Sequence, residues 1–266
     1  PRSTLFPYTT LFRSEGGNRF VELWSQVNRE AIREAGREGM TGFYSRPGWG
    51  DTGSFADGVF STRGEKTGDA EEVIARGLFI GLCGGGSWHA DIIPRGLRKE
   101  AGREAFMRSV EAAALSPVFR LRDGEPYWLD RGIMRHLARM SRFWAALKPY
   151  HKAVSDEYRN AGLPPLRHPA THYPAEPLAP TRAGRCLYGR DLLAAPLAKP
   201  GSDLLDLTLP EDRWVHLWSS REFRGGDITI EAPLGSPAVF FRADSPWAPL
   251  FDSLRRSLTR FEDPLA

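Results

Sequence analysis

The stretch that decides the fold is residues 70–93, which read AEEVIARGLFIGLCGGGSWHADII. Its first half places the apolar residues Val73, Ile74 and Leu78 at helical spacing, and a run of glycines at 84–86 then interrupts the pattern. Residues 87–93 follow with the character of a strand end. A helix that returns through glycines to a strand is one unit of a parallel α/β fold.

The same alternation is present upstream of this unit. Residues 20–32 carry apolar side chains at helical spacing, and Gly36 is a plausible stop. Residues 41–45 then form a short apolar run that ends at Arg46. The pattern predicts a helix, a strand and a loop in that order.

The alternation also continues downstream. We expect helices near residues 99–115 and 132–147, with a strand-like run at 117–121 between them. Repeated βα units of this kind predict a parallel sheet with active-site residues on the loops after the strands. Residues 15–163 would then supply the C-terminal half of a TIM (β/α)8 barrel.

Beyond Gly162 the composition changes to frequent prolines and short alternating runs, such as RWVHLW at 213–218 and DITIE at 227–231. We expect an antiparallel β-sandwich over residues 164–246 and a helical tail over 247–266. The aromatic residues of these strands have the spacing of a sandwich core rather than of a sugar-stacking strip. They are Trp214, Trp218, Phe240 and Phe241.

Composition excludes several classes of partner. The formal net charge of the 266 residues is only +3 and both signs are interleaved, so nucleic acid is not an expected partner. The longest apolar run, 78–82, is far shorter than the roughly 20 residues of a membrane helix, so no membrane partner is expected. Cys83 and Cys186 fit no zinc or CxxC spacing and indicate reduced thiols in a cytoplasmic protein.

The first residues do not read as protein. Residues 4–14, TLFPYTTLFRS, resemble the translation of a sequencing adapter, and they lack the basic region and apolar run of a signal peptide. We therefore expect residues 1–14 to be an artefact and the natural start to lie upstream. Removing Arg2 and Arg13 lowers the count of Lys and Arg from 36 to 34 against 33 acidic residues, which leaves a net charge of +1.

Taken together, these segments resemble glycoside hydrolase family 31, the α-glycosidases built on a TIM barrel followed by β-domains, and within it the sulfoquinovosidase subfamily. The barrel part of the likeness is carried by VNREA at 27–31, Ser45-Arg46, RGLFIGL at 76–82 with WHADI at 88–92, and LKPY at 147–150. The C-terminal part is more specific: LPEDRWVHLW at 209–218, FRGG at 223–226 and PAVFFRADSPW at 237–247.

The resemblance implies a retaining hydrolase, which needs two carboxyl groups roughly 5 Å apart. The family's nucleophile is an aspartate on an earlier strand, and no matching motif follows an apolar strand here. The family's acid/base lies in a Gly-Asp pair that corresponds to Gly64-Glu65, so Glu65 is the first candidate and Asp69 the second. The alternative is that both are solvated loop carboxylates beside Arg63 and Lys66.

The resemblance also implies substrate contacts. Arg46 corresponds to an arginine that holds the sugar, and Asp91 to an aspartate that orients it, with Trp88 and His89 offering an aromatic face and a polar edge. Each of these has a structural alternative: a surface arginine before a turn, a strand-end carboxylate, or a core aromatic or histidine.

Two positions depart from the family. Arg95 stands where the subfamily has a tyrosine that helps hold the sulfonate, and Arg122 stands where a histidine is usual. Arg95 could pair with an anionic group or lie solvated on its loop.

The expected function is hydrolysis of small α-glucosides or α-sulfoquinovosides, with no cofactor and no metal implied. The alternative is a divergent, non-catalytic carbohydrate-binding relative. Because the nucleophile is missing, we expect this chain alone to be inactive. An open half-barrel would also expose apolar surface and associate into a homo-oligomer.

Overall fold

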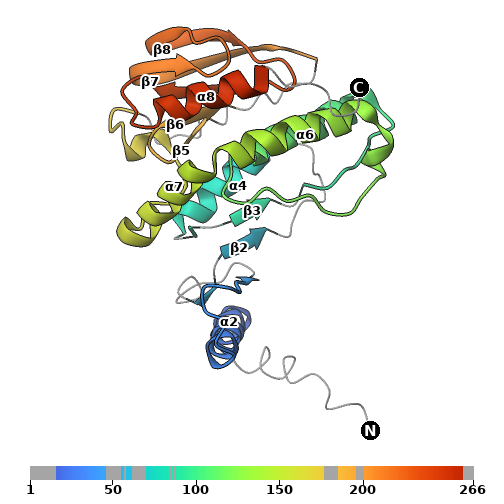
Figure 1. The fold of residues 1–266 in the computed structure, drawn as a ribbon, viewed down its shortest axis with the longest axis vertical. Coiled ribbons are helices and arrows are strands. Elements are labelled where there is room, and N and C mark those ends of the chain that lie inside the picture. Colours follow the sequence, from blue (N-terminus) through green and yellow to red (C-terminus); the bar gives the residue numbers. More distant parts are fainter. Residues whose placement is uncertain are drawn as a thin grey trace.

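The computed structural model combines a small parallel sheet, a set of helices and a larger antiparallel sheet (Figure 1). The predicted artefact at residues 1–14 lies outside the described part of the chain. The described residues are 16–45, 55–56, 58–61, 70–83, 85–86, 88–90, 92–176, 185–195 and 201–259.

The parallel sheet contains three short strands in chain order: β1 (Tyr44–Ser45), β2 (Gly58–Ser61) and β3 (Trp88–Ala90). Both pairings are parallel, and Ile92 forms one further parallel bridge with Leu121. Neighbouring parallel strands in chain order are what successive βα units produce. The prediction of a parallel sheet is therefore confirmed for these strands, and β2 and β3 are joined by the helix at residues 70–82 as a βαβ unit.

Four helices were predicted before residue 163, and the structure has them within a few residues of the expected positions. They are α2 (Gly17–Glu34), α4 (Ala70–Leu82), α5 (Glu100–Ala113) and α6 (Arg131–Ala146). Helix α2 is attached to the strand region by polar contacts. Ser25 Oγ donates to Ser45 Oγ at 3.1 Å, and Arg29 Nε donates to the carbonyl of Phe55 at 2.8 Å.

The structure differs from the prediction at two places in the helical region. The run at 117–121 contributes only the single bridge at Leu121 rather than a strand. A further helix, α7 (Lys148–Ala161), begins one residue after α6 and was not expected. Pro149 lies in its first turn, where the missing proline N–H costs nothing, and Gly162 ends it in the left-handed conformation.

The second sheet contains six strands in the order β4-β5-β6-β9-β7-β8, and every pairing is antiparallel. A one-turn 3-10 helix, η2 (Pro169–Thr171), follows its first strand. The strands are β4 (Leu166–Arg167), β5 (Cys186–Tyr188), β6 (Leu192–Ala195), β7 (Leu204–His216), β8 (Glu222–Glu231) and β9 (Ala238–Arg242).

Among the described residues, the region expected to form a β-sandwich contains one six-stranded antiparallel sheet that folds over itself. Trp214–His216 of β7 pairs with β9, but the register of β7 against β8 shifts between Leu209 and Arg213. Beyond that irregularity Leu207 is buried in the same cluster as Leu193 of β6. The far half of the β7–β8 hairpin therefore covers the face of its own sheet, as an irregularity that bends a strand allows.

The other face of this sheet shares a core with the helices. Phe241 of β9 and Phe143 of α6 belong to one buried cluster with Phe251 of α8 (Ala248–Thr259), the predicted helical tail. The rings of Phe241 and Phe251 lie 5.3 Å apart. The sheet aromatics Trp214, Phe240 and Phe241 are at most 3% exposed, which confirms that they are core residues.

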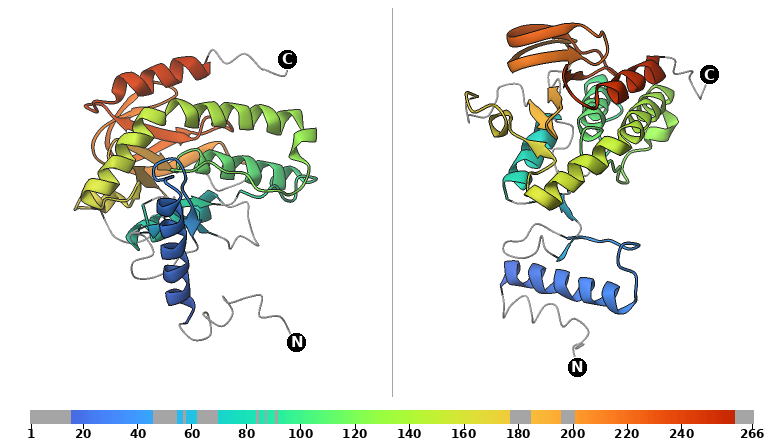
Figure 2. Two further views of the ribbon diagram at one scale, coloured as in Figure 1. Left: turned by 60° about the horizontal axis from the view of Figure 1, so that its bottom comes forward. Right: turned by 60° about the vertical axis from the view of Figure 1, so that its left-hand side comes forward.

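The molecule is elongated, with α2 at one end and the β7–β8 hairpin at the other (Figure 2). The parallel strands lie between α2 and the remaining helices. No helix in the described ranges combines the length and the apolar character needed to cross a bilayer.

Candidate active-site edge

The parallel strands end at one edge of their sheet. Ser45 pairs with Val59, and Ser61 pairs with Ala90, so the carboxyl ends of β1, β2 and β3 are adjacent. In α/β folds this edge is where substrates bind, because the loops after the strands converge there.

The candidate residues Arg46, Glu65, Asp69 and Asp91 belong to segments that leave this edge. Arg46 follows β1 in the chain, Glu65 and Asp69 follow β2, and Asp91 follows β3. All four lie outside the described residues. Their roles in catalysis and sugar binding stay predictions.

Trp88 belongs to the interior. Its side chain is fully buried, and its Nε1 has no hydrogen-bond partner among the described residues. A Cβ placed on Gly77 of α4 would lie 2.1 Å from Trp88 Cζ2, so the indole packs directly on that glycine. The structure thus assigns Trp88 a packing role, and its contact with a sugar stays a prediction. His89 lies in β3, and its side chain is outside the described set.

The loops after Ile92 and Leu121 are joined at this edge. The amide of Arg122 donates to the carbonyl of Ile92 at 3.0 Å, and the amide of Glu125 donates to the carbonyl of Pro94 at 2.8 Å. We call residues 93–98 and 122–130 together the rim. The two loops form one backbone unit because two backbone hydrogen bonds connect them.

The carboxylate of Glu125 fixes the rim from within. It accepts hydrogen bonds from the amides of Gly96 at 2.6 Å and Leu97 at 2.9 Å. Gly96 has a φ of +68°, a conformation that favours glycine and turns its amide toward the carboxylate. Gly124 is also required, since a Cβ there would lie 2.5 Å from the carbonyl oxygen of Pro94. A charged acceptor on two backbone amides is a strong constraint.

Arg95 and Arg122 are both exposed on the rim, one from each loop. A guanidinium presents several N–H donors in a plane and binds carboxylate, sulfonate or phosphate oxygens well. The structure therefore brings these two predicted residues to the same joined pair of loops. Their contact with substrate stays a prediction.

Sequence reasoning overlooked the short 3-10 helix η1 (Tyr127–Leu129) at the far end of the rim. Trp128 is 59% exposed and Leu129 is 76% exposed, whereas the neighbouring Tyr127 packs against the core. The signal was present in the sequence, because EPYWLD at 125–130 places two aromatics and a leucine directly before an N-cap aspartate.

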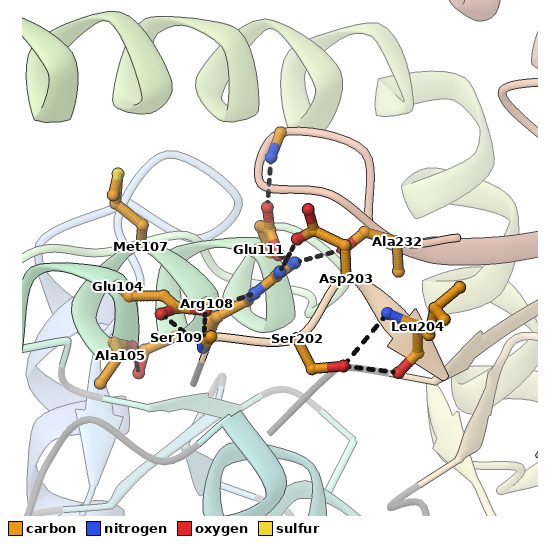
Figure 3. A network of polar contacts seen from close by, with 12 residues as sticks. Glu104, Ala105, Met107, Arg108, Ser109, Glu111, Ser202, Asp203, Leu204 and Ala232 are labelled. Carbon is orange, nitrogen blue, oxygen red and sulfur yellow. Dashed lines mark hydrogen bonds and ion pairs between the residues drawn. The ribbon is translucent and has the colours of Figure 1, made fainter. Parts of the chain in front are cut away.

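A cluster of buried charges lies elsewhere, where α5 and α6 meet the antiparallel sheet. Arg108 Nη1 donates to the carbonyl of Ala232 at 2.8 Å and lies 3.2 Å from Glu111, while its Nη2 lies 3.3 Å from Asp203 (Figure 3). Glu111 in turn accepts from the amide of Gly235 at 2.6 Å. These side chains hold the turn between β8 and β9 against helix α5.

Burial controls the protonation of this cluster. Loss of hydration raises the pKa of Glu111 to about 7, against the opposing effect of Arg108. Burial lowers the pKa of His136 to about 4, so the ring is neutral near pH 7 and its Nε2–H donates to the carbonyl of Met107 at 3.0 Å. Arg139 Nε donates to the carbonyl of Gly235 at 2.7 Å. The charged groups contact one another and the backbone, so this cluster stabilises the packing of the helices against the antiparallel sheet.

A metal site has no support in the described ranges, where no group of three or more His, Cys, Asp or Glu side chains is placed to bind an ion.

Comparison with known proteins gives concordant results. Residues 162–245 match the Glycosyl hydrolase family 31 C-terminal domain. The chain is 34% identical over 252 residues to a sulfoquinovosidase of Escherichia coli K12, covering 90% of this chain and 37% of that protein. It is 37% identical over 256 residues to a sulfoquinovosidase of Agrobacterium fabrum, covering 90% of this chain and 38% of that protein. The chain thus spans less than two fifths of the length of these relatives.

The fold agrees with a solved structure. A family GH31 sulfoquinovosidase from E. rectale, in complex with the aza-sugar inhibitor IFGSQ, superposes with a TM-score of 0.80. The two sequences are 30% identical, and the match covers 90% of this chain and 38% of the other.

Proposed function

Because the chain belongs to glycoside hydrolase family 31, we propose that it is the C-terminal part of a retaining α-glycosidase acting on α-sulfoquinovosides or α-glucosides. The observation that carries this proposal is the likeness to two sulfoquinovosidases over 90% of the chain. We call the complete polypeptide that contains this chain the parent polypeptide. In it, residues 15–163 form half of the barrel, 164–246 form the β-domain and 247–266 form the tail.

The proposed reaction divides two carboxyl roles between the missing and the present parts. A nucleophilic aspartate from the upstream part bonds to the anomeric carbon while the bond to the leaving oxygen breaks and Glu65 gives that oxygen its proton. Water then attacks the anomeric carbon and releases the nucleophile, while Glu65 takes a proton from the water. Asp69 is the alternative acid/base.

The substrate contacts follow from the edge described above. Arg46 and Asp91 bind the hydroxyl groups of the sugar, and Arg95 and Arg122 bind an anionic substituent. Two observations support the second assignment: both arginines are exposed residues of the rim, and Glu125 connects the two loops of the rim through hydrogen bonds to Gly96 and Leu97. Trp88 supports β3 from the core, and His89 is a further candidate contact.

The test is turnover of 4-nitrophenyl α-sulfoquinovoside and 4-nitrophenyl α-glucoside, followed by release of nitrophenolate. We expect turnover by the parent polypeptide and none by this chain alone, which lacks the nucleophile. Glu65→Gln and Asp69→Asn should differ, with a loss of roughly 100-fold or more in kcat for the true acid/base. If the parent polypeptide hydrolyses neither glycoside, the proposal is rejected. Turnover by this chain alone would also reject it.

A second candidate function is sugar binding without hydrolysis. It is favoured by Glu65 at a position where the family has aspartate and by Arg122 where a histidine is usual. A longer side chain displaces the acid by about an ångström, enough to impair proton transfer. Saturable binding of the methyl α-glycoside by the parent, without any turnover, would favour this candidate.

A further inference from the structure

The rim exposes a large apolar surface at one point, the indole of Trp128 and the adjacent side chain of Leu129. Exposed tryptophan is uncommon, because burying its large apolar ring is strongly favourable. Its neighbour Tyr127 is partly buried and packs against the core, with its ring centroid 6.2 Å from that of Phe106. The Trp128 ring stands edge-on to that of Tyr127 at 5.3 Å and an angle of 78°. The exposed indole is thus supported from beneath.

The backbone beneath Trp128 is held at both ends. On one side the Glu125 carboxylate is bound to the amides of Gly96 and Leu97. On the other, Asp130 caps helix α6 by accepting from the amide of Ile133 at 3.0 Å, and it pairs with Arg103 at 2.7 Å. The indole is therefore exposed on a loop whose backbone is held in place at both ends.

The position of Trp128 relates it to the proposed catalytic edge. Its loop follows Leu121, whose neighbour Ile92 comes directly after Asp91 in the chain. Under the proposed function, Asp91 holds the sugar that is cleaved. Trp128 is exposed seven residues beyond Leu121, on the loop that leaves the same edge of the sheet, and the leaving group has to extend outward from that edge.

We propose that the indole of Trp128 is a binding platform for the leaving group of the glycoside. The inference rests on the proposed function and names the part of the substrate that this chain selects. A planar indole packs against the C–H face of a sugar or against an aryl ring, and both groups lose water on contact. The proposal predicts a preference for glycosides whose leaving group has such an apolar face.

The experiment compares two substrates of the parent polypeptide that share one sugar. In 4-nitrophenyl α-sulfoquinovoside the leaving group can cover an indole, whereas in α-sulfoquinovosyl fluoride it is a single atom. For Trp128→Ala we expect kcat/KM for the aryl glycoside to fall about ten-fold relative to that for the fluoride, mainly through KM. Trp128→Phe should recover most of the loss, because a smaller aromatic face remains.

The matched control is Trp24→Ala, which removes an equally exposed indole (54%) from helix α2. It should leave the ratio of the two kcat/KM values unchanged. If Trp128→Ala leaves the ratio of the two kcat/KM values unchanged, the inference is overturned while the proposed function stands. This includes the case in which both values fall equally and the Tm is lowered. If the unmodified parent hydrolyses neither substrate, the proposed function fails and the inference falls with it.

Discussion

Replacing Glu111 by glutamine should remove a large part of the pH dependence of stability. Burial raises the pKa of Glu111 to about 7 in the folded chain, whereas the ordinary pKa of an unburied glutamate is 4.5. Since the folded pKa is the higher one, the stabilisation is complete at low pH and is lost as the pH rises from about 4.5 to about 7. That difference in pKa corresponds to about 3 kcal/mol.

The assay is urea unfolding of both proteins at intervals between pH 4.5 and 8, followed by tryptophan fluorescence. The quantity of interest is the unfolding free energy of the unmodified chain minus that of Glu111→Gln. His136, whose Nε2 lies 3.8 Å from Glu111, titrates in both proteins and so cancels to first order. We expect the difference to fall by about 3 kcal/mol across the range.

Glu100→Gln is the matched control, because Glu100 lies in the first turn of the same helix with its side chain 84% exposed. It should show no such trend, since water screens an exposed carboxylate. A flat difference for Glu111→Gln would refute the reasoning from burial. A difference that rises with pH would show that the ion pair with Arg108 outweighs burial.

Three further changes test the packing and the rim. Gly77→Ala should destabilise the chain by more than about 2 kcal/mol, because its Cβ would lie 2.1 Å from the Trp88 ring; thermal unfolding measures this, and an unchanged Tm would contradict the packing. Glu125→Gln should speed hydrogen exchange at the amide of Gly96, since a neutral acceptor binds more weakly; equal exchange rates would show that the carboxylate does not hold the rim. Phe251→Ala should cost roughly 3–5 kcal/mol of unfolding free energy through the cavity it leaves, and a loss below about 1 kcal/mol would mean that α8 is not part of the core.

The fold could be predicted where local pattern decides local structure. Helices α2, α4, α5 and α6 follow directly from the spacing of their apolar residues. Helix α7 was overlooked because Pro149 reads as a break, although a proline in the first turn of a helix is well tolerated. The course of β7 depends on a register shift between Leu209 and Arg213 that a period-two pattern does not predict, so the folding of the sheet over itself could not be predicted.

The contacts of the rim and of the buried charge cluster could not be predicted from the sequence, because they join residues that are far apart in the chain. Glu125 binds amides 28 and 29 residues away, and Arg108 reaches the carbonyl of Ala232 across 124 residues. Propensity and spacing report on neighbours in the chain and carry no information about such contacts. For the same reason the sequence left two roles open for Trp88, sugar contact and core packing, and its burial against Gly77 depends on how α4 packs on β3.

The proposed function makes this chain part of an α-glycosidase that cleaves with retention. The most direct measurement is proton NMR of the first sugar that the parent polypeptide releases from 4-nitrophenyl α-sulfoquinovoside, recorded before the anomers equilibrate. Retention predicts the α-anomer, which is formed by two successive inversions at the anomeric carbon. First appearance of the β-anomer would contradict it.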